Sequence, residues 1–359
     1  MTAPTAPTAP TALTATQALV RTGHRSARQQ GAALLLAMLL LALVASLAAG
    51  MVWQQWRAVQ VEAADRSRSQ SAWILAGALD WSRLILREDA RSGPVDHLGE
   101  PWATPLAEAR LSSFLAADRE ATADSEVEAF LAGSITDAQS RYNLRNLFTD
   151  DGKAVAAEHQ TLGRLCAAAG LRGDEAQRII TGLAGAWRAR AAAPPQGGAS
   201  APEAGPALSP ADEAARPLPV QRFEHLSWLG LEPNVLPALR PLVDVLPTRT
   251  PVNLNTASRD VLAAVLGVDV GTAERVVQAR QRQAFTQLDQ VRALMPPDSA
   301  MDSALDGARV SVGSEYFEVR GRLRLEERVL EEISLMRRRG VAEVLPVHRF
   351  RRNLQAGPD

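Results

Sequence analysis

The chain has 359 residues, of which 46% are hydrophobic, and a formal net charge of -1 at pH 7. This length allows two or three modest domains with their own cores, and the near-zero charge argues against a strongly basic nucleic-acid-binding protein. The single cysteine, Cys166, forms no internal disulfide and lies in an apolar helical pattern, so it is predicted to be a buried core thiol.

The N-terminal region predicts a membrane-spanning helix. After twenty low-complexity, proline-rich residues, the basic stretch RTGHRSAR (21–28) precedes 22 uncharged residues, 31–52. At about 1.5 Å per residue this stretch forms a helix about 33 Å long, enough to cross a bilayer core. Trp53 and Trp56 follow like interfacial anchors. By the positive-inside rule the N-terminus is expected in the cytoplasm and the rest of the chain beyond the membrane.

The sequence leaves three interpretations of this segment open: a secretory signal cut near ASLAAG (45–50), an uncut anchor, and a stem trimmed after Gly31. The helical pattern continues past Arg57, with apolar residues spaced along residues 74–85, and stops at SGP (92–94). One long helix over about residues 32–92, apolar and then amphipathic, favours the trimmed stem.

A basic leader that ends in glycine and runs directly into such a helix resembles the N-terminus of type IV pilins and type II secretion pseudopilins. The resemblance implies that a prepilin peptidase removes residues 1–31, cutting between Gly31 and Ala32, and methylates the new N-terminus. Most pseudopilins carry glutamate at the fifth mature position, where it pairs with the terminal amine of a neighbouring subunit in the membrane. This sequence has Leu36 there, and the K-type minor pseudopilin is the member that typically lacks the glutamate.

The stretch SITDAQSRYNLRNL (134–147) predicts an extended segment followed by a turn and a short helix, and it resembles the K-type signature of the form ITDxQxRFNLNNL. Its apolar members are predicted to be core residues: Ile135, Tyr142, Leu144 and Leu147. Its polar members are predicted to satisfy backbone groups of a tight connection rather than to catalyse a reaction: Asp137, Gln139, Asn143 and Asn146.

Helical periodicity between about residues 154 and 193 predicts helices that are separated near Gly170 and Gly173. A tract rich in proline, glycine, alanine and serine follows over residues 191–219 and is predicted to be an exposed, flexible loop. K-type proteins usually have an acidic run after the tryptophan that ends this helical region. Here Trp187 is followed by RAR, so the sequence departs from the family at this point.

Residues 251–294 have the pattern of a helix-hairpin-helix (SAM-like) motif. Asn255 or Thr256 is predicted to cap a helix through residues 261–266, and a second helix is predicted over about residues 272–282. The loop between them contains three residues that mark the hairpin: Gly267, Asp269 and Gly271.

In many modules such a glycine hairpin offers backbone N–H groups to a nucleic-acid phosphate, so a membrane-tethered nucleic-acid-binding protein is the alternative function. Against it, the Asp269 carboxylate would repel a phosphate, and the predicted topology places the hairpin outside the cytoplasm. The same pattern resembles the helical insert of K-type pseudopilins, where the motif packs against other parts of the protein and has a structural role.

From about residue 309 the apolar periodicity changes to two, which predicts two or three antiparallel strands that end the chain. YFEVRGRLRL (316–325) resembles the closing strands of the K-type family. The alternating charged residues are expected on a solvent face, and the basic stretch HRFRRNLQ (348–355) in a surface patch.

The sequence contains no HExxH, GxSxG or phosphate-loop motif, and its five histidines lie far apart, so no catalytic residue is assigned. An exported hydrolase with a signal peptide is the third alternative. The resemblance leaves a structural calcium ion open. Five aspartates in loops have suitable oxygens without EF-hand spacing, and no ligand is assigned among Asp150, Asp151, Asp298, Asp302 and Asp306.

The resemblance covers most of the chain and implies an α+β fold. A long N-terminal helix (32–92, membrane span about 32–53) leads into an antiparallel sheet domain whose first part is residues 93–153. A mainly helical insert (154–308) interrupts the sheet, and residues 309–359 supply its closing strands.

The implied function is that of a minor pseudopilin that caps the type II secretion pseudopilus and helps to initiate its assembly for export of folded proteins. A head of roughly 270 residues is too bulky to repeat along closely stacked helices. The implied partners are the I-type and J-type minor pseudopilins, the major pseudopilin and the prepilin peptidase, with no nucleic acid. The implied location is the inner membrane, with a periplasmic C-terminal domain. The helix residues expected at the assembly contacts are Leu36, Trp73, Leu79, Trp81 and Ile85.

Overall fold

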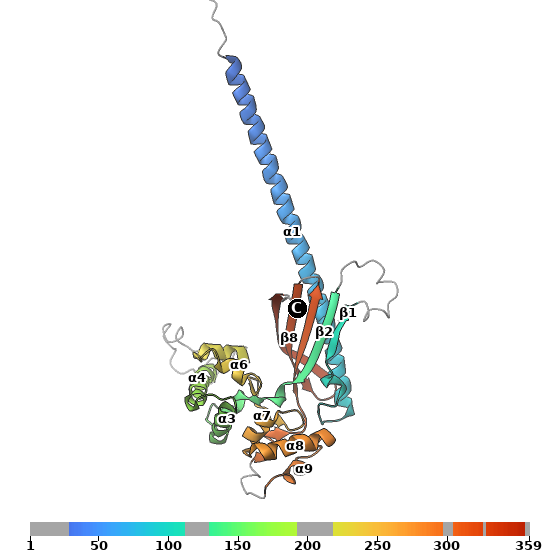
Figure 1. Ribbon diagram of the computed structural model, residues 1–359, viewed down its shortest axis with the longest axis vertical. Helices are drawn as coiled ribbons and strands as arrows, with labels where there is room; N and C mark the ends of the chain where they lie inside the picture. The colour runs from blue at the N-terminus through green and yellow to red at the C-terminus, as the bar shows by residue number, and fades with distance from the viewer. Residues whose placement is uncertain (1–28, 112–128, 192–217, 297–303, 326–327, 356–359) are drawn as a thin grey trace, which may run out of the picture. The chain divides into compact units, whose positions relative to one another are not determined.

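The computed structural model describes residues 29–111, 129–191, 218–296, 304–325 and 328–355 (Figure 1). The predicted leader up to residue 28 and most of the predicted loop at 191–219 lie outside the described residues. The chain divides into two compact units, Met1–Ser69 and Gln70–Asp359, which are described separately.

Helix α1, Gln29–Ser92, is a single helix of 64 residues, and its first part lies in the first unit. Every residue from 31 to 63 is exposed. Among the described residues α1 is the only helix that is long and apolar enough to cross a membrane, and none of its most apolar stretch is buried. Such a surface needs lipid or other helices around it. The predicted continuous helix that ends at SGP is confirmed.

The second unit contains a five-stranded antiparallel sheet in the order β1-β2-β7-β8-β9. The strands are β1, Leu106–Arg110; β2, Ala129–Asp137; β7, Tyr316–Leu325; β8, Arg328–Arg339; and β9, Glu343–Gln355. Strand β2 pairs with β7 from Ala129 opposite Leu325 to Asp137 opposite Phe317. The predicted antiparallel sheet, built from the middle and the end of the chain, is therefore confirmed.

The C-terminal part of α1 packs on one face of this sheet through apolar side chains. Leu75 lies in a buried cluster with Leu323 of β7. Farther along, Leu79 shares a cluster with Trp102, which follows α1 in the short 3-10 helix η1, Pro101–Ala103. The Trp102 ring meets the Phe317 ring edge to face, with centroids 5.3 Å apart. This packing sets which side of α1 faces outward.

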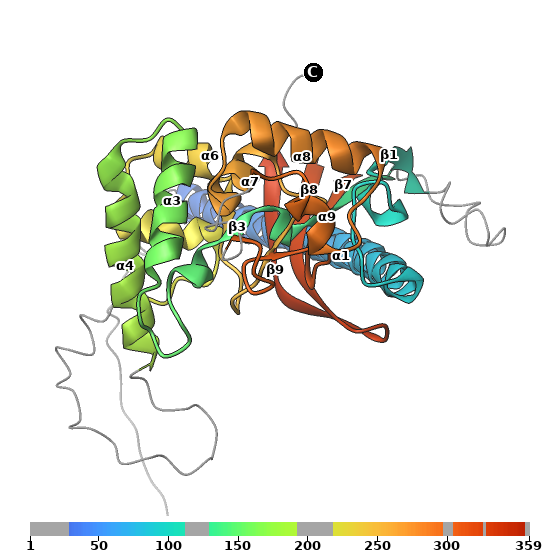
Figure 2. The same ribbon diagram turned by 90° about the horizontal axis from the view of Figure 1, so that it is seen from below.

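The rest of the second unit is mainly helical. Its elements are α3, Ala156–Ala168; α4, Gly173–Ala191; η4, Phe223–Leu229; α6, Val235–Leu239; α7, Arg259–Leu266; α8, Val270–Arg282; and α9, Leu288–Arg292. Figure 2 shows α3 and α4 side by side, and Gly170 adopts a left-handed φ of 70° in the turn between them. Cys166 is buried in the large cluster that these helices share with Tyr142 and Leu144, so its predicted core role is confirmed.

The signature segment folds as predicted. Strand β2 runs into η2, Ala138–Ser140, then β3, Tyr142–Asn143, and η3, Leu144–Leu147. Its four apolar residues are all buried: Ile135, Tyr142, Leu144 and Leu147. A short parallel pair, β3 with β4, Val243–Asp244, ties it to the helical region. A second parallel pair joins β5, Val252–Asn253, to β6, Val310–Ser311, just before the closing strands.

The predicted cap of α7 was wrong. Ser258 caps the helix and accepts a hydrogen bond from Val261 N at 3.4 Å, whereas Asn255 and Thr256 are buried in side-chain contacts elsewhere. Helix α8 begins at Val270, two residues earlier than predicted, because Asp269 supplies its N-cap.

The basic C-terminal stretch is not only a surface patch. It forms most of β9, where Arg349 and Arg351 pair with Glu332, and Arg352 pairs with Glu331. Both glutamates are buried, at 3% and 5% exposed. The other charged residues predicted on the solvent face agree only in part: Arg322 and Arg328 are exposed, whereas Arg320 and Arg324 are half-buried and pair with Glu318 and Glu108. Glu326 and Glu327 lie outside the described residues.

Candidate assembly surface and its polar support

The outward face of α1 in the second unit carries two uncovered tryptophans. Trp73 is 78% exposed and Trp81 is 63% exposed. Gly77 lies midway between them, and residues four apart share a face of a helix. Because large exposed aromatic side chains usually mark contact sites, this row is a candidate assembly surface.

The other helix residues predicted for assembly lie in different surroundings. Leu79 is 4% exposed and packs inside the protein's own core, so its side chain orients α1 instead of facing a partner. Ile85 is half-buried against the same cluster. Leu36, in the first unit, is 60% exposed within the apolar stretch.

Beside the tryptophan row, the surface is hollowed into a groove of about 900 Å³. Apolar side chains from α1, η1, β1 and β2 dominate its lining, among them Ile74, Trp81, Trp102, Leu106 and Leu131. The sheet contributes small and polar residues, including Gly133, Glu332 and Ser334. The groove therefore combines aromatic walls with a few polar groups, which is the usual composition of a specific binding site.

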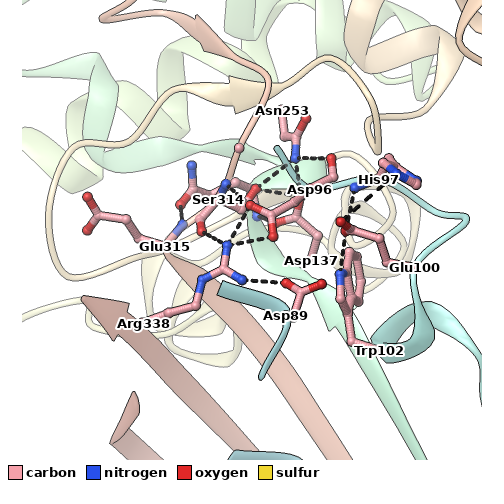
Figure 3. A network of polar contacts seen from close by, with 12 residues as sticks. Asp89, Asp96, His97, Glu100, Trp102, Asp137, Asn253, Ser314, Glu315 and Arg338 are labelled. Carbon is pink, nitrogen blue, oxygen red and sulfur yellow. Dashed lines mark hydrogen bonds and ion pairs between the residues drawn. The ribbon is translucent and has the colours of Figure 1, made fainter. Parts of the chain in front are cut away.

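A buried polar network fastens the end of α1 to the sheet (Figure 3). Arg338 of β8 donates from Nη1 to Asp89 of α1 at 2.6 Å, and from Nη2 to both oxygens of Asp96 at 2.5 and 2.6 Å. The three side chains are at most 7% exposed. Charge-assisted hydrogen bonds of this kind are strong and directional, so Arg338 fixes the last turn of α1 and the following loop on β8.

Asp137, the last residue of β2, extends the network toward the helical region. Its carboxylate accepts hydrogen bonds from the hydroxyls of Thr256 at 2.6 Å and Ser314 at 2.7 Å, and from Asn253 Nδ2 at 3.1 Å. Gln139 N also donates to it, at 2.7 Å. One buried carboxylate thus joins β2, the segment after β5 and the segment before β7.

Asp89 and Asp96 share the guanidinium of Arg338, and the Asp137 carboxylate lies close enough to Asp96 to disfavour its ionised form. Burial raises the pKa of Asp96 to about 7, although Arg338 and Ser314 N favour its ionised form. Burial also raises the pKa of Asp137, and the hydrogen bonds that it accepts from Ser314 and Thr256 lower this pKa by a smaller amount. Asp96 is therefore ready to take up a proton near neutral pH.

The polar residues of the signature satisfy backbone groups, as predicted. Gln139 Oε1 accepts hydrogen bonds from the N–H groups of Glu315 and Tyr316. Asn146 makes a reciprocal pair with the backbone of Thr250, donating at 2.8 Å and accepting at 3.1 Å. Asn143 Oδ1 accepts from Arg145 N at 3.0 Å and Leu246 N at 3.1 Å. These side chains therefore supply the hydrogen bonds that regular secondary structure would otherwise give to the backbone of the connection.

The α7–α8 loop contains two of the three predicted hairpin residues, Gly267 and Asp269, while Gly271 belongs to α8. Gly267 ends α7 with a left-handed φ of 69°. The Asp269 carboxylate accepts hydrogen bonds from Thr272 N at 3.0 Å and the Thr272 hydroxyl at 2.6 Å, which lowers the pKa of Asp269. The side chain of Asp269 thus occupies the N-terminus of α8, where a phosphate would have to bind. Gly271 lies in the first turn of α8, close to the same carboxylate.

The acidic residues are arranged differently from the ligands of a calcium site. In the described part of the chain, one group brings three carboxylate oxygens within 4.8 Å of one another: Asp89, Asp96 and Glu100. Arg338 already binds Asp89 and Asp96, and Glu100 accepts hydrogen bonds from Trp102 Nε1 and His97 N. A guanidinium in this position takes the oxygens that a calcium ion requires, so the group does not fit one.

Of the loop aspartates named from the sequence, the three that the structure describes are each engaged by protein groups. Asp151 pairs with Lys153 at 2.7 Å, and Asp150 lies 3.7 Å from Arg145. Asp306 accepts a hydrogen bond from Ala308 N at 3.0 Å. Asp298 and Asp302 lie outside the described residues.

The sequence did not single out Asp89, Asp96, Asn253, Ser314 or Arg338. Arg338 stands in a run of three arginines, and no local pattern separates it from its neighbours. The one residue of the sequence that could have pointed to this network is Gly313, just before Ser314. A Cβ on Gly313 would collide with the carbonyl oxygen of Pro94. A glycine required by a close backbone approach indicates that two segments meet there.

The sequence matches the family described as Type II secretion system (T2SS), protein K, over residues 140–248 and 252–312. The type II secretion system protein K of Klebsiella pneumoniae is 30% identical over 301 residues, covering 81% of this chain and 86% of the relative. A solved structure, the GspK-GspI-GspJ complex from enterotoxigenic Escherichia coli, contains a chain with the same fold at a TM-score of 0.57 and 20% identity. The match covers 81% of this chain and 98% of that chain.

The strongest of these sequence relationships is with the type II secretion system protein K of Pseudomonas aeruginosa, which is 31% identical over 318 residues. The aligned region covers 86% of this chain and 89% of the relative. On this similarity the chain belongs to the family of type II secretion system protein K.

Proposed function

We propose that this protein caps the tip of the type II secretion pseudopilus as a minor pseudopilin and helps to start its assembly. The observation that carries the proposal is an exposed helix with an apolar stretch at residues 31–52, on a chain whose second unit, Gln70–Asp359, is a large head. Subunits that stack through closely spaced helices leave little room between neighbours, so a head of this size fits at the end of the filament.

The helix is retained after processing. A peptidase cuts between Gly31 and Ala32, the new N-terminus is methylated, and α1 stays in the inner membrane with the second unit in the periplasm. The basic residues at 21–28, which precede the span, support this orientation. Leu36 supports the tip position, because a subunit with no neighbour above it needs no carboxylate to pair with that neighbour's amine.

The partners are the I-type and J-type minor pseudopilins, by analogy with the GspK-GspI-GspJ complex of the structural relative. The exposed row of Trp73 and Trp81 supports a contact through the amphipathic part of α1. Its apolar area is uncovered in the single chain and would be removed from water in the complex.

The helix-hairpin-helix motif has a structural role, in which its helices pack into the core of the second unit, and it binds no nucleic acid. The apolar faces of α7 and α8 are buried through Val261, Leu262 and Val276. The Asp269 carboxylate adds negative charge at the position where a phosphate would bind. No enzymatic role is proposed, since the function of the family is structural.

Co-purification tests this function. The full-length chain, co-expressed with the I-type and J-type pseudopilins and extracted in detergent, is expected to elute as a complex with both. Elution as a monomer in their presence would contradict the proposal. Filter binding of DNA to the same preparation distinguishes this function from the nucleic-acid-binding alternative. That alternative predicts tight binding at low salt, which weakens steeply with added salt because it depends on phosphate contacts.

A further inference from the structure

We propose that the η4–β9 contact, made of Arg222, His225, His348 and Phe350, is an acid-sensitive connection between the helical region and the sheet, which forms while both imidazoles are neutral and loosens when His225 binds a proton. Strand β9 is the edge strand of the sheet, so it has a strand neighbour on one side only. The η4–β9 contact depends on the fold alone and not on the partners proposed above.

Arg222, the residue before η4, spans this contact. Its guanidinium lies over the Phe350 ring of β9, 5.5 Å from the ring centroid. Its Nε and Nη2 atoms lie 3.1 and 2.9 Å from Nε2 of His225. None of the carboxylates that the structure describes forms an ion pair with Arg222. The position of the guanidinium therefore depends on a ring nitrogen of His225.

The protonation state of His225 decides whether these hydrogen bonds exist. An arginine side chain carries only donors and stays charged in proteins, so Nε2 has to accept and cannot carry a proton. Protonation of His225 places an N–H donor and a positive charge against the guanidinium. The His225 ring also stacks on Trp228, with centroids 4.0 Å apart. Because an aromatic face attracts a cation, the protonated ring is expected to stay on Trp228 while Arg222 moves away.

The second imidazole, His348 of β9, lines the same small pocket as Arg222 and Phe350. Burial and the charge of Arg222 lower the pKa of both histidines. The opposing influences are weaker and come from the Pro219 backbone on His225, from Glu224 on both rings, and from Asp244 and Glu318 on His348. The fold therefore favours the neutral form of both rings.

Each of the three carboxylates that line this pocket already has a cationic partner. The pairs are Glu318 with Arg141 at 3.3 Å, Arg240 at 3.3 Å and Arg320 at 3.0 Å, Asp244 with Arg141 at 2.6 Å, and Glu224 with Arg240 at 3.3 Å. A proton on either histidine therefore adds a cation where the carboxylates are already engaged. The pairs of Arg141 and Arg240 with Glu318 of β7 also join the helical region to the sheet, so acid loosens the η4–β9 contact and leaves the two regions attached.

The η4–β9 contact should weaken in acid. A histidine whose pKa is lowered by folding stabilises the folded contact while it is neutral, so the contact has its full strength above the ordinary histidine pKa of 6.5 and loses it as the pH falls. Asp96 titrates in the opposite sense, because its pKa is raised and proton uptake there stabilises the second unit. Loosening in acid that is confined to η4 and β9 therefore cannot come from Asp96.

Hydrogen–deuterium exchange of the full-length chain in detergent, at pH 8 and pH 5, tests this contact after correction for the intrinsic pH dependence of exchange. The amides of η4 and of β9 near Phe350 are expected to lose protection several-fold at pH 5, while those of α7 keep theirs. His225→Gln offers Arg222 an uncharged acceptor at both pH values and is expected to abolish the response. His225→Lys carries a cation at both and is expected to lower the protection already at pH 8.

His159→Gln, on α3, is the matched control. His159 Nε2 lies 3.2 Å from Leu147 O, and a protonated ring donates to a carbonyl as a neutral one does, so this variant is expected to keep the wild-type response. Equal protection of η4 and β9 at the two pH values in the wild type would overturn the proposal. An acid response that persists in His225→Gln, or wild-type protection of His225→Lys at pH 8, would overturn it as well. None of these outcomes bears on the proposed function.

Discussion

Arg338 and Asp96 lie 242 positions apart in the sequence, yet the guanidinium of Arg338 donates to both oxygens of the buried Asp96 carboxylate. Asp89, in the last turn of α1, binds the same guanidinium. The end of α1 is thereby fixed to β8, the strand that also carries Ser334. The geometry of the groove, with one wall on the helix and its floor on the sheet, depends on this connection.

Removing the cation should destabilise the second unit strongly. Arg338→Met leaves Asp89 and Asp96 buried without their partner, and breaking a buried ion pair in this way costs about 3–5 kcal/mol of unfolding free energy. Urea denaturation monitored by tryptophan fluorescence measures the change. Arg339→Met, at the exposed neighbouring position, is the control and should alter the stability little. Equal effects of the two substitutions would contradict the structural role of Arg338.

The stability of the second unit should depend on pH through Asp96. Its pKa is about 7 in the folded protein against 3.8 for an ordinary aspartate. The folded state therefore binds a proton that the unfolded state lacks between these values, so stability falls as pH rises from 4 through 7. The raised pKa of Asp137 acts in the same direction.

Asp96→Asn removes this titration, so its unfolding free energy should change less between pH 5 and 8 than that of the wild type. Urea denaturation at three pH values in this range measures the two slopes. Identical slopes in the two proteins would show that Asp96 is not the titrating group.

Local patterns predicted the long helix, the signature segment and the closing strands, because periodicity and turn chemistry are encoded in neighbouring residues. The polar network was missed because its members are brought together only by the fold. The prediction of the residue that caps α7 was wrong for the same reason. Three polar residues precede the helix, and the sequence does not reveal that Thr256 donates to Asp137 and Asn255 to Phe285 O, which leaves Ser258 for the cap.

The hairpin carboxylate should stabilise α8 as an N-cap. Asp269→Ala removes the acceptor for Thr272 N, so the thermal midpoint should fall, measured by circular dichroism. Asp260→Ala, in the first turn of α7, is the control and should have a smaller effect. Neither the wild type nor the Asp269→Ala protein is expected to bind DNA at low salt. DNA binding gained on this substitution would show that the hairpin is a phosphate site blocked only by the carboxylate.

Cys166 should be unreactive in the native protein. Burial raises the pKa of its thiol to about 11, with a smaller contribution from Glu175, so little thiolate is present at pH 8. A thiol-specific chromogenic reagent should modify it at pH 8 only after unfolding in denaturant. Rapid stoichiometric modification of the folded chain would contradict its place in the core.

The central claim is that the apolar helix survives in the mature protein and anchors a head that caps a filament. Intact-mass spectrometry of the protein isolated from the inner membrane of the native host tests this most directly. The predicted result is a chain that begins at Ala32 with a methylated amine and is present in the membrane fraction. A mature chain that begins near Ala49 or Gly50 and is free in the periplasm would contradict the account.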